Sequence, residues 1–463
     1  MMEKLGEKFT ELFKKYLPDA FVFALVLTLL TALSALIWTD TSVMGIIEAW
    51  YQGFWMLLEF GMQMILLLVT GYSIALASPV KRFLFKITQF IQTPRQLYPF
   101  IIIIGMLLSS ISWGWVVITA VLARELALRI KGVNYPYLIA CVYFTGVIWV
   151  SGFSSSIPLL LNTENNYLIE SGILNETIST SYSLGSILNI SIIVFSFILT
   201  PLLFLLFIPK KQQSLEEMMI SDNPNQELTI VEEADSMRIS GNPISDRLNN
   251  TLIFQYILGV MGLVYIFYYF STKGFDINLN IMIFIFIVLG LLLHQTPMRY
   301  GIVMKRSSGN ISGILFQFPF YAGIMGIMLY TGLGDVVTKW MVSVASLETI
   351  PLMAYLNGAI VNFAIPSAGG EFAVVGPSII NAVKELGVGL PEGELTELIA
   401  KASMAVAFGE SLTNCLQPFY LLVILPVMGI GIRIQARDIM GYLFLPFLIF
   451  FIAWALMIFF IPM

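Results

Sequence analysis

The sequence has few charged residues and almost none of the side chains that usually build enzyme active sites. Asp, Glu, Lys and Arg make up 11% of the 463 residues, whereas a typical soluble domain has about 25%. There is one histidine, His294, and there are two cysteines, Cys141 and Cys415, both in apolar segments. We therefore expect no disulfide framework, metal centre or cofactor. Without a second histidine or a nucleophile elbow, an enzyme is the least favoured class, and no basic stripe suggests nucleic-acid binding.

The abundant residues are apolar: 58% are hydrophobic, with a mean hydropathy of +0.86. Apolar windows recur at about 20 residues, the length that crosses a bilayer. They predict an all-α polytopic membrane protein with nine spans, at residues 19–38, 54–77, 135–161, 184–208, 251–270, 279–293, 311–332, 398–428 and 439–462. An amphipathic helix at residues 2–17 is expected to lie on the membrane surface before the first span.

The basic residues predict how the chain is oriented. Of its 24 Lys and Arg residues, all but Lys273, Lys339, Lys384 and Lys401 fall in segments that the positive-inside rule makes cytoplasmic. This places the protein in the plasma (inner) membrane, with the N-terminus in the cytoplasm and the C-terminus outside.

Two further apolar segments, at residues 99–123 and 350–380, begin and end on the same predicted side and are expected to be re-entrant hairpins. Two of the spans are interrupted, at residues 149–158 and 409–418, by Gly, Ser, Pro and Glu, which lipid cannot accommodate. The order of spans, hairpin and broken span occurs twice with opposite orientation. We therefore predict an N-terminal inverted repeat (1–209), a cytoplasmic linker (210–250), and a C-terminal half (251–463) with an extra span and the second repeat.

Several dispersed motifs resemble one bacterial family, the short-chain fatty acid transporters, which form part of a wider superfamily of ion-coupled carboxylate carriers. They lie at residues 60–64, 113–114, 152–158, 292–298, 317–323, 362–377, 408–410 and 417–419. The resemblance implies uptake of short-chain monocarboxylates such as butyrate or acetoacetate. The family pattern over residues 366–372 is Pro-Ser-Gly-Gly-Gly followed by a polar residue and Trp, and the chain departs from it with Ala368, Glu371 and Phe372. It also departs at Ser112, where the family tends to have Asn.

The broken segments supply the candidate site. Among the predicted spans only 398–428 contains a basic residue, Lys401 near its outer end, so no Arg or Lys is left in the hydrocarbon and neutral donors and helix N-termini would hold a small carboxylate. The candidate substrate-binding residues are Ser112, Trp113, Gly114, Gly152, Ser154, Ser155, Ser156, Asn362, Pro366, Ser367, Gly369, Gly370, Thr413, Asn414 and Gln417. Alternatively, these small residues only allow close helix packing.

Carboxylates at membrane depth are the candidates for coupling to H⁺ or Na⁺, because their burial is costly. They are Glu371, Glu410 and Glu59, and a Na⁺ ion could lie near Ser155, Ser367 and Asn414. Structural alternatives are a water-exposed hairpin tip for Glu371, hydrogen bonding alone for Glu410, and a local pair with Gln63 for Glu59. His294 is interpreted as a helix-end residue rather than a titrating switch.

The sequence thus predicts a secondary active transporter that imports short-chain monocarboxylates by cation symport with alternating access. A carrier of dicarboxylates or amino acids on the same fold is the alternative, and a passive anion channel is less favoured. The expected partners are the substrate and the lipid bilayer, and the choice between a monomer and a homodimer stays open.

Overall fold

The computed structural model describes residues 20–209, 213–219, 229–241, 243–417, 421–429, 431–434 and 436–462. This part of the chain is helical, with one isolated bridge between Met219 and Ile432. By length and composition, six of its helices could cross a membrane, or seven if α18 (Ser312–Tyr330) and α19 (Leu333–Val344) count as one bent span. The all-α membrane fold is as expected, whereas nine spans remain a prediction. The expected helix at 2–17 lies outside the described residues.

Two helical hairpins form where they are predicted, and both are longer than expected. The first consists of α6 (Pro94–Ile111), the short turn η1 (Trp113–Trp115) and α7 (Val116–Arg129), and the second of α20 (Ile350–Val361) and α21 (Ala368–Leu386). A serine with extended backbone lies at each tip: Ser112, between α6 and η1, has φ −153° and ψ 131°, and Ser367, before α21, has φ −154° and ψ 109°. Neither serine side chain caps the following helix, so each tip ends the first arm abruptly.

Both interrupted spans are broken in the structure. The first comprises α8 (Tyr135–Thr145), the 3₁₀ turn η2 (Gly146–Ser151) and α9 (Ser156–Leu161). The second comprises α22 (Glu392–Thr413), the turn η5 (Asn414–Leu416) and α23 (Leu421–Met428). The helix α22 packs closely on α20: a Cβ added to Gly409 would stand 2.1 Å from the Tyr355 carbonyl oxygen. Only glycine permits that approach.

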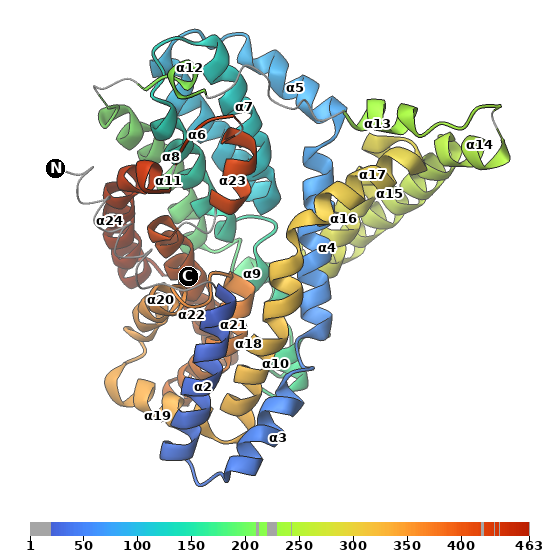
Figure 1. The fold of residues 1–463 in the computed structure, drawn as a ribbon. Helices are drawn as coiled ribbons and strands as arrows, with labels where there is room; N and C mark the ends of the chain where they lie inside the picture. Colours follow the sequence, from blue (N-terminus) through green and yellow to red (C-terminus); the bar gives the residue numbers. More distant parts are fainter. Residues whose placement is uncertain are drawn as a thin grey trace.

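A second group of helices packs beside the hairpins and broken spans. It comprises α2 (Ala20–Trp38), α3 (Val43–Gly53), α4 (Leu58–Ala75), α15 (Ile253–Lys273), α16 (Leu279–His294), α17 (Pro297–Ser307) and α18. Figure 1 shows α4 beside α16, and α2 and α3 beside α18. The helices α11 (Ile187–Leu206) and α24 (Ala436–Phe460) pack on the hairpins and broken spans. One large buried apolar cluster runs through most of these helices, whereas buried residues of α3 and α17 belong to two smaller clusters.

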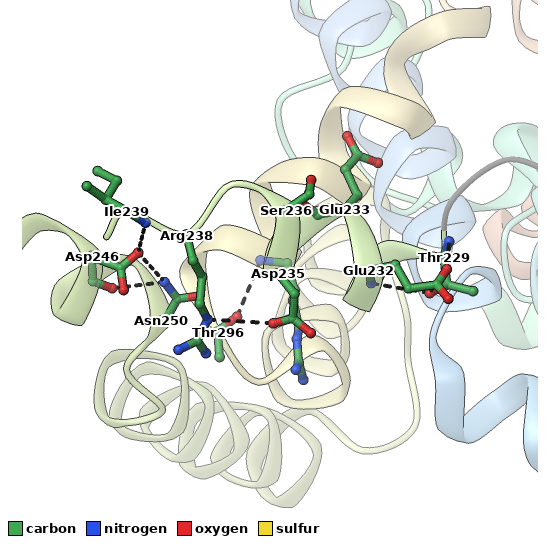
Figure 2. A network of polar contacts seen from close by, with 11 residues as sticks. Thr229, Glu232, Glu233, Asp235, Ser236, Arg238, Ile239, Asp246, Asn250 and Thr296 are labelled. Atoms are coloured by element: carbon green, nitrogen blue, oxygen red, sulfur yellow. Dashed lines mark hydrogen bonds and ion pairs between the residues drawn. The ribbon is translucent and has the colours of Figure 1, made fainter. Parts of the chain in front are cut away.

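The described parts of the predicted linker contain three short helices, α12 (Leu215–Met218), α13 (Ile230–Ser236) and α14 (Ile244–Asn250). Figure 2 shows how polar contacts order the second and third: Asp246 accepts from the Ile239 backbone N–H and from Asn250, and Thr229 caps α13 with Glu232. Ile230 and Ala234 pack on α17, where Glu233 pairs with Arg306. The segment is therefore docked on the helical body over residues 229–241 and 243–250.

Short helices also occur where the sequence indicates only loops. The helix α19 follows α18 after a bend of 75° at Gly332, and α5 (Ser78–Thr88) follows α4. Gly332 has φ +78°, which glycine adopts without strain, so the chain can turn there. These helices have 12 and 11 residues of mixed polarity, fewer than a span requires, which is why a hydropathy window does not detect them.

A long-range contact joins the first hairpin to the second broken span. The Arg124 guanidinium on α7 donates to the carbonyl oxygens of Val427 (3.4 Å) and Met428 (3.0 Å), and the Tyr135 hydroxyl also donates to Met428 O (2.7 Å). These carbonyls end α23, where a cation is favourable. A residue of the N-terminal half thus completes a helix of the C-terminal half.

Candidate functional site

The tip of the first hairpin contacts the break in the first broken span. The Phe153 N–H donates to Ser110 O (2.7 Å), and the Trp113 N–H donates to Ser154 Oγ (3.2 Å). Gly152 is required there, because an added Cβ would lie 2.1 Å from Ser110 O. The Ser112 side chain lies against Gly71 of α4. The predicted residues of this hairpin and this break are therefore neighbours.

The second hairpin and the second break are joined by one network of amide side chains. Asn362 Nδ2 faces Thr413 Oγ1 (2.8 Å), Glu410 O (3.0 Å) and Asn414 Oδ1 (3.2 Å). Gln417 Nε2 donates to Asn362 O and to Asn414 Oδ1, both at 3.1 Å. All five residues are buried. Five of the predicted residues thus form one connected unit that fixes the hairpin against the broken span.

The two breaks also contact each other. The Tyr143 hydroxyl of α8 lies 2.7 Å from Asn414 O and 2.5 Å from Gln417 O, and Ser411 Oγ donates to Val147 O at 2.6 Å. These contacts link the 3₁₀ turns of the two broken spans, so the four interrupted elements meet in one region. Tyr143 and Ser411 are absent from the predicted site, and Tyr143 has no signal in the sequence because it lies in an otherwise apolar segment.

Two of the three candidate carboxylates lie in this region. Glu371, in the first turn of α21, is 0% exposed, and neither of its carboxylate oxygens has a hydrogen-bond partner among the described residues. Glu410 is 1% exposed; its Oε1 accepts from Asn414 Nδ2 at 2.7 Å, while Oε2 has no partner in the described part. Glu371 lies on α21 and Glu410 on α22, and these two helices pack against each other. The alternative of a water-exposed tip for Glu371 is therefore wrong.

Neither carboxyl has a cationic partner among the residues that the structure describes. The two ion pairs found in the described ranges, Arg238–Asp235 and Arg306–Glu233, both involve linker residues. A carboxylate without a counter-charge is very costly to bury. Both carboxyls would therefore be costly to bury in the ionised form.

The start of α21 offers hydrogen-bond donors beside these carboxyls. The first N–H groups of a helix have no intrahelical acceptor, and no side chain caps this one. Gly369 lies near Ser156, whose hydroxyl is buried without a partner among described residues, as is that of Ser155. The rings of Phe60 and Tyr321 come within 2.8 Å of where Cβ atoms on Gly369 and Gly370 would stand. Because both positions are glycine, the rings of Phe60 and Tyr321 can pack directly beside the free N–H groups at the start of α21.

The other candidate residues lie as follows. Gly114 and Pro366 are buried at the two tips. Glu59 is exposed in the first turn of α4, and Gln63 bonds to Asn280 (3.0 Å) rather than to Glu59, so a local pair is not formed. His294 is at the end of α16, as interpreted, where its Nε2 contacts Ser73 O at 2.8 Å. Pro418 and Phe419 of the quoted motif lie outside the described residues.

Comparisons with known proteins agree with the motifs. A family model described as "Short chain fatty acid transporter" matches residues 1–461. A protein of Escherichia coli (strain K12), provisionally named as a short-chain fatty acid transporter, is 37% identical over 445 residues, 96% of each chain. A Haemophilus influenzae protein with the same provisional name is 34% identical over 449 residues, again 96% of each chain.

Two solved structures have a similar fold. One is MtrF of Neisseria gonorrhoeae, with a TM-score of 0.56 and 14% identity over 96% of each chain; that protein is described as illuminating a class of antimetabolite efflux pumps. The other is the YdaH transporter of Alcanivorax borkumensis, with a TM-score of 0.56 and 14% identity over 95% of this chain and 98% of that one. At this identity the similarity concerns the fold alone.

Proposed function

Since the chain belongs to the short-chain fatty acid transporter family, we propose that it carries short-chain monocarboxylates of the butyrate and acetoacetate class across the membrane. Transport is coupled to H⁺ or Na⁺ by symport and proceeds by alternating access. The observation that carries this proposal is a pair of buried carboxyls, without a cationic partner among the described residues, where two hairpin tips and two broken spans meet.

Internal symmetry supports alternating access. When the helices α2–α7 are paired in chain order with α16–α21, the packing of one set repeats in the other. The α2–α18 contact corresponds to α16–α4, the α3–α18 contact to α17–α4, and the α5–α7 contact to α19–α21. The contacts of α9 with α21 and of α23 with α7 are paired in the same way. We infer two inverted repeats with re-entrant hairpins, the N-terminus in the cytoplasm and the C-terminus outside. Such repeats place binding sites near the midplane of the membrane.

The coupling ion would lie among acceptors that lack donors. Glu410 Oε2, Asn362 Oδ1 and both oxygens of Glu371 are buried without a partner in the described ranges. No group of three or more His, Cys, Asp or Glu residues in the described part could hold a metal. The acceptor set therefore suits a proton, or a Na⁺ ion that also uses carbonyl and amide oxygens near Asn414. Glu59 has no role in this arrangement.

The substrate carboxylate would bind at the start of α21, which offers neutral donors. The N–H groups of its first turn and the hydroxyls of Ser155 and Ser156 can donate to it. Phe60 and Tyr321 offer an apolar wall for a short acyl tail. None of these donors carries a positive charge, so a second carboxylate on the substrate would find no cation among them. This favours monocarboxylates over dicarboxylates or amino acids.

Import is the proposed direction, and the description of Neisseria MtrF as an efflux pump makes export the competing direction for a protein of this fold. A passive channel is distinguished by accumulation, because only a coupled carrier concentrates butyrate beyond equilibrium. A thermal-shift screen of C2 to C6 carboxylates, with and without Na⁺, would identify the cargo and the ion together.

Glu410→Gln tests the proposal in proteoliposomes with an imposed H⁺ or Na⁺ gradient. We expect loss of ion-driven butyrate accumulation with folding preserved, because the amide keeps the shape of the side chain but not its charge. Glu176→Gln, at an exposed position, is the matched control and should transport normally. Normal accumulation by Glu410→Gln would refute the role of Glu410, and no ion-driven accumulation by the wild type in either direction would refute the function.

A further inference from the structure

Asp276 lies in the turn between α15 and α16 and receives an unusual number of hydrogen bonds. Its Oδ1 accepts from Thr180 Oγ1 (2.7 Å), Thr180 N (3.0 Å), Asn162 Nδ2 (3.0 Å) and Ser179 Oγ (3.1 Å). Hydrogen bonds to a charged acceptor are stronger than neutral ones. One carboxylate oxygen thus binds residues that lie far earlier in the chain.

These donors belong to the far end of the first broken span and to the loop after it. Asn162 is the C-cap of α9, and its Nδ2 also donates to Ile277 O at 2.9 Å. The adjacent Thr163 Oγ1 accepts from the Leu279 N–H at 3.2 Å. The end of α9 is thereby fastened to the start of α16 by both side-chain and backbone groups.

The helix α9 connects this fastening to the candidate site. It begins at Ser156, which lies beside Gly369, and has six residues, or about 9 Å of helix. A helix this short has no internal flexibility to absorb a movement at one end. Whatever holds Asn162 therefore also positions the hydroxyls of Ser155 and Ser156.

The two partners lie in different groups of helices. The helix α9 packs on α21 and α22, which form the site, whereas α16 packs mainly on α4 and α15. If alternating access moves the first group relative to the second, the bonds to Asp276 lie across the moving boundary. The hydrogen bonds to Asp276 must break, or the α15–α16 turn must move with α9, before the site can open on the face of the protein where this turn lies.

We propose that Asp276 is a positioning residue that fastens the end of α9 to the α15–α16 turn and keeps the site closed on the face of this turn. The proposal rests on the proposed function only in assuming that the site opens by alternating access. The charge of Asp276 strengthens the fastening, and removing the carboxylate favours the conformation open on this face.

Thiol labelling tests this without substrate. Ser156→Cys is the reporter, and the native Cys141 and Cys415 contribute little because both are 0% exposed. A membrane-impermeant maleimide is added separately to vesicles of each orientation. Phe275→Cys, at a position 73% exposed beside Asp276, identifies the side on which the turn lies.

With Asp276→Ala we expect the reporter to be labelled on the order of tenfold faster than in the otherwise wild-type chain, on the side of the turn only. Asp276→Asn should give an intermediate rate, because an amide oxygen still accepts but carries no charge. Glu176→Gln on the same loop should label at the wild-type rate. Thr180→Val removes one donor while keeping the carboxylate, so it gives a second test if Asp276→Ala does not fold.

Unchanged labelling in folded Asp276→Ala and Thr180→Val, or faster labelling on the opposite side alone, would overturn the proposal. Labelling does not depend on cargo or coupling ion, so it separates the two hypotheses. A transporter that fails to accumulate butyrate but shows the labelling change refutes the proposed substrate, not the role of Asp276.

Discussion

Asn362→Asp is the change that most directly tests the amide network at the second hairpin. The two side chains have the same shape, but Asn362 Nδ2 lies within hydrogen-bond distance of three oxygen acceptors: Glu410 O, Thr413 Oγ1 and Asn414 Oδ1. In the variant an oxygen replaces that donor. A third buried carboxyl then joins Glu371 and Glu410.

The expected cost follows from those contacts. Asn362→Ala loses two good hydrogen bonds, at about 1 kcal/mol each, and leaves a small cavity, so unfolding should become easier by about 2–3 kcal/mol. Two of the three acceptors keep another donor: Glu410 O still accepts from Thr413 Oγ1, and Asn414 Oδ1 still accepts from Gln417 Nε2. Asn362→Asp loses the same bonds and adds repulsion between oxygens, so it should cost more than the alanine variant.

The measurement is thermal unfolding of the purified protein in detergent, followed by tryptophan fluorescence. We expect the order wild type, then Asn362→Ala, then Asn362→Asp, with Asn175→Asp at an exposed position matching the wild type. An Asn362→Asp protein as stable as the wild type, without added cation, would show that Nδ2 does not donate to this network. The reasoning about the site would then fail at its centre.

Two further changes test other parts of the fold. Gly409→Ala places a Cβ 2.1 Å from the Tyr355 carbonyl oxygen and should destabilise the protein by about 1–3 kcal/mol or more. Gly393→Ala, where an added Cβ would meet nothing within 4 Å, is the control and should leave stability unchanged. Equal melting temperatures for the two variants would contradict the α20–α22 packing. Glu233→Gln breaks the ion pair with Arg306. Because both side chains are partly exposed, the free energy of unfolding should change by less than about 1 kcal/mol. A large loss in the same assay would mean that α13 is held mainly by charge rather than by the packing of Ile230 and Ala234.

Much of the site was predictable because breaks in apolar segments are conspicuous. Polar residues, Gly and Pro inside a membrane-length window identify the two hairpin tips and the two breaks, and the structure brings Asn362, Glu410, Thr413, Asn414 and Gln417 together. The hydropathy signal indicates which residues lipid cannot solvate, and such residues can only be buried against one another.

Contacts between distant segments could not be predicted in this way. Tyr143 and Phe60 look like ordinary residues of apolar helices, and only the packing of the two halves places them at the breaks and at Gly369. Glu59 shows the converse error: a carboxylate within a predicted span is exposed in the structure, while its neighbour Gln63 bonds to a residue 217 positions away. Hydropathy reports depth in a membrane, not the direction in which a side chain points.

The contact between Arg124 and the end of α23 has a consequence for how the protein is made. The residues it joins are 303 and 304 positions apart, so at about 5–20 residues per second the ribosome needs about 15–60 s to supply Val427 and Met428 after Arg124. During that interval the nascent first hairpin has no α23 to cap. We therefore expect the insertion machinery to retain the first hairpin until nearly the whole chain has been synthesised, and a chain that stops before Val427 to be a substrate for membrane proteases.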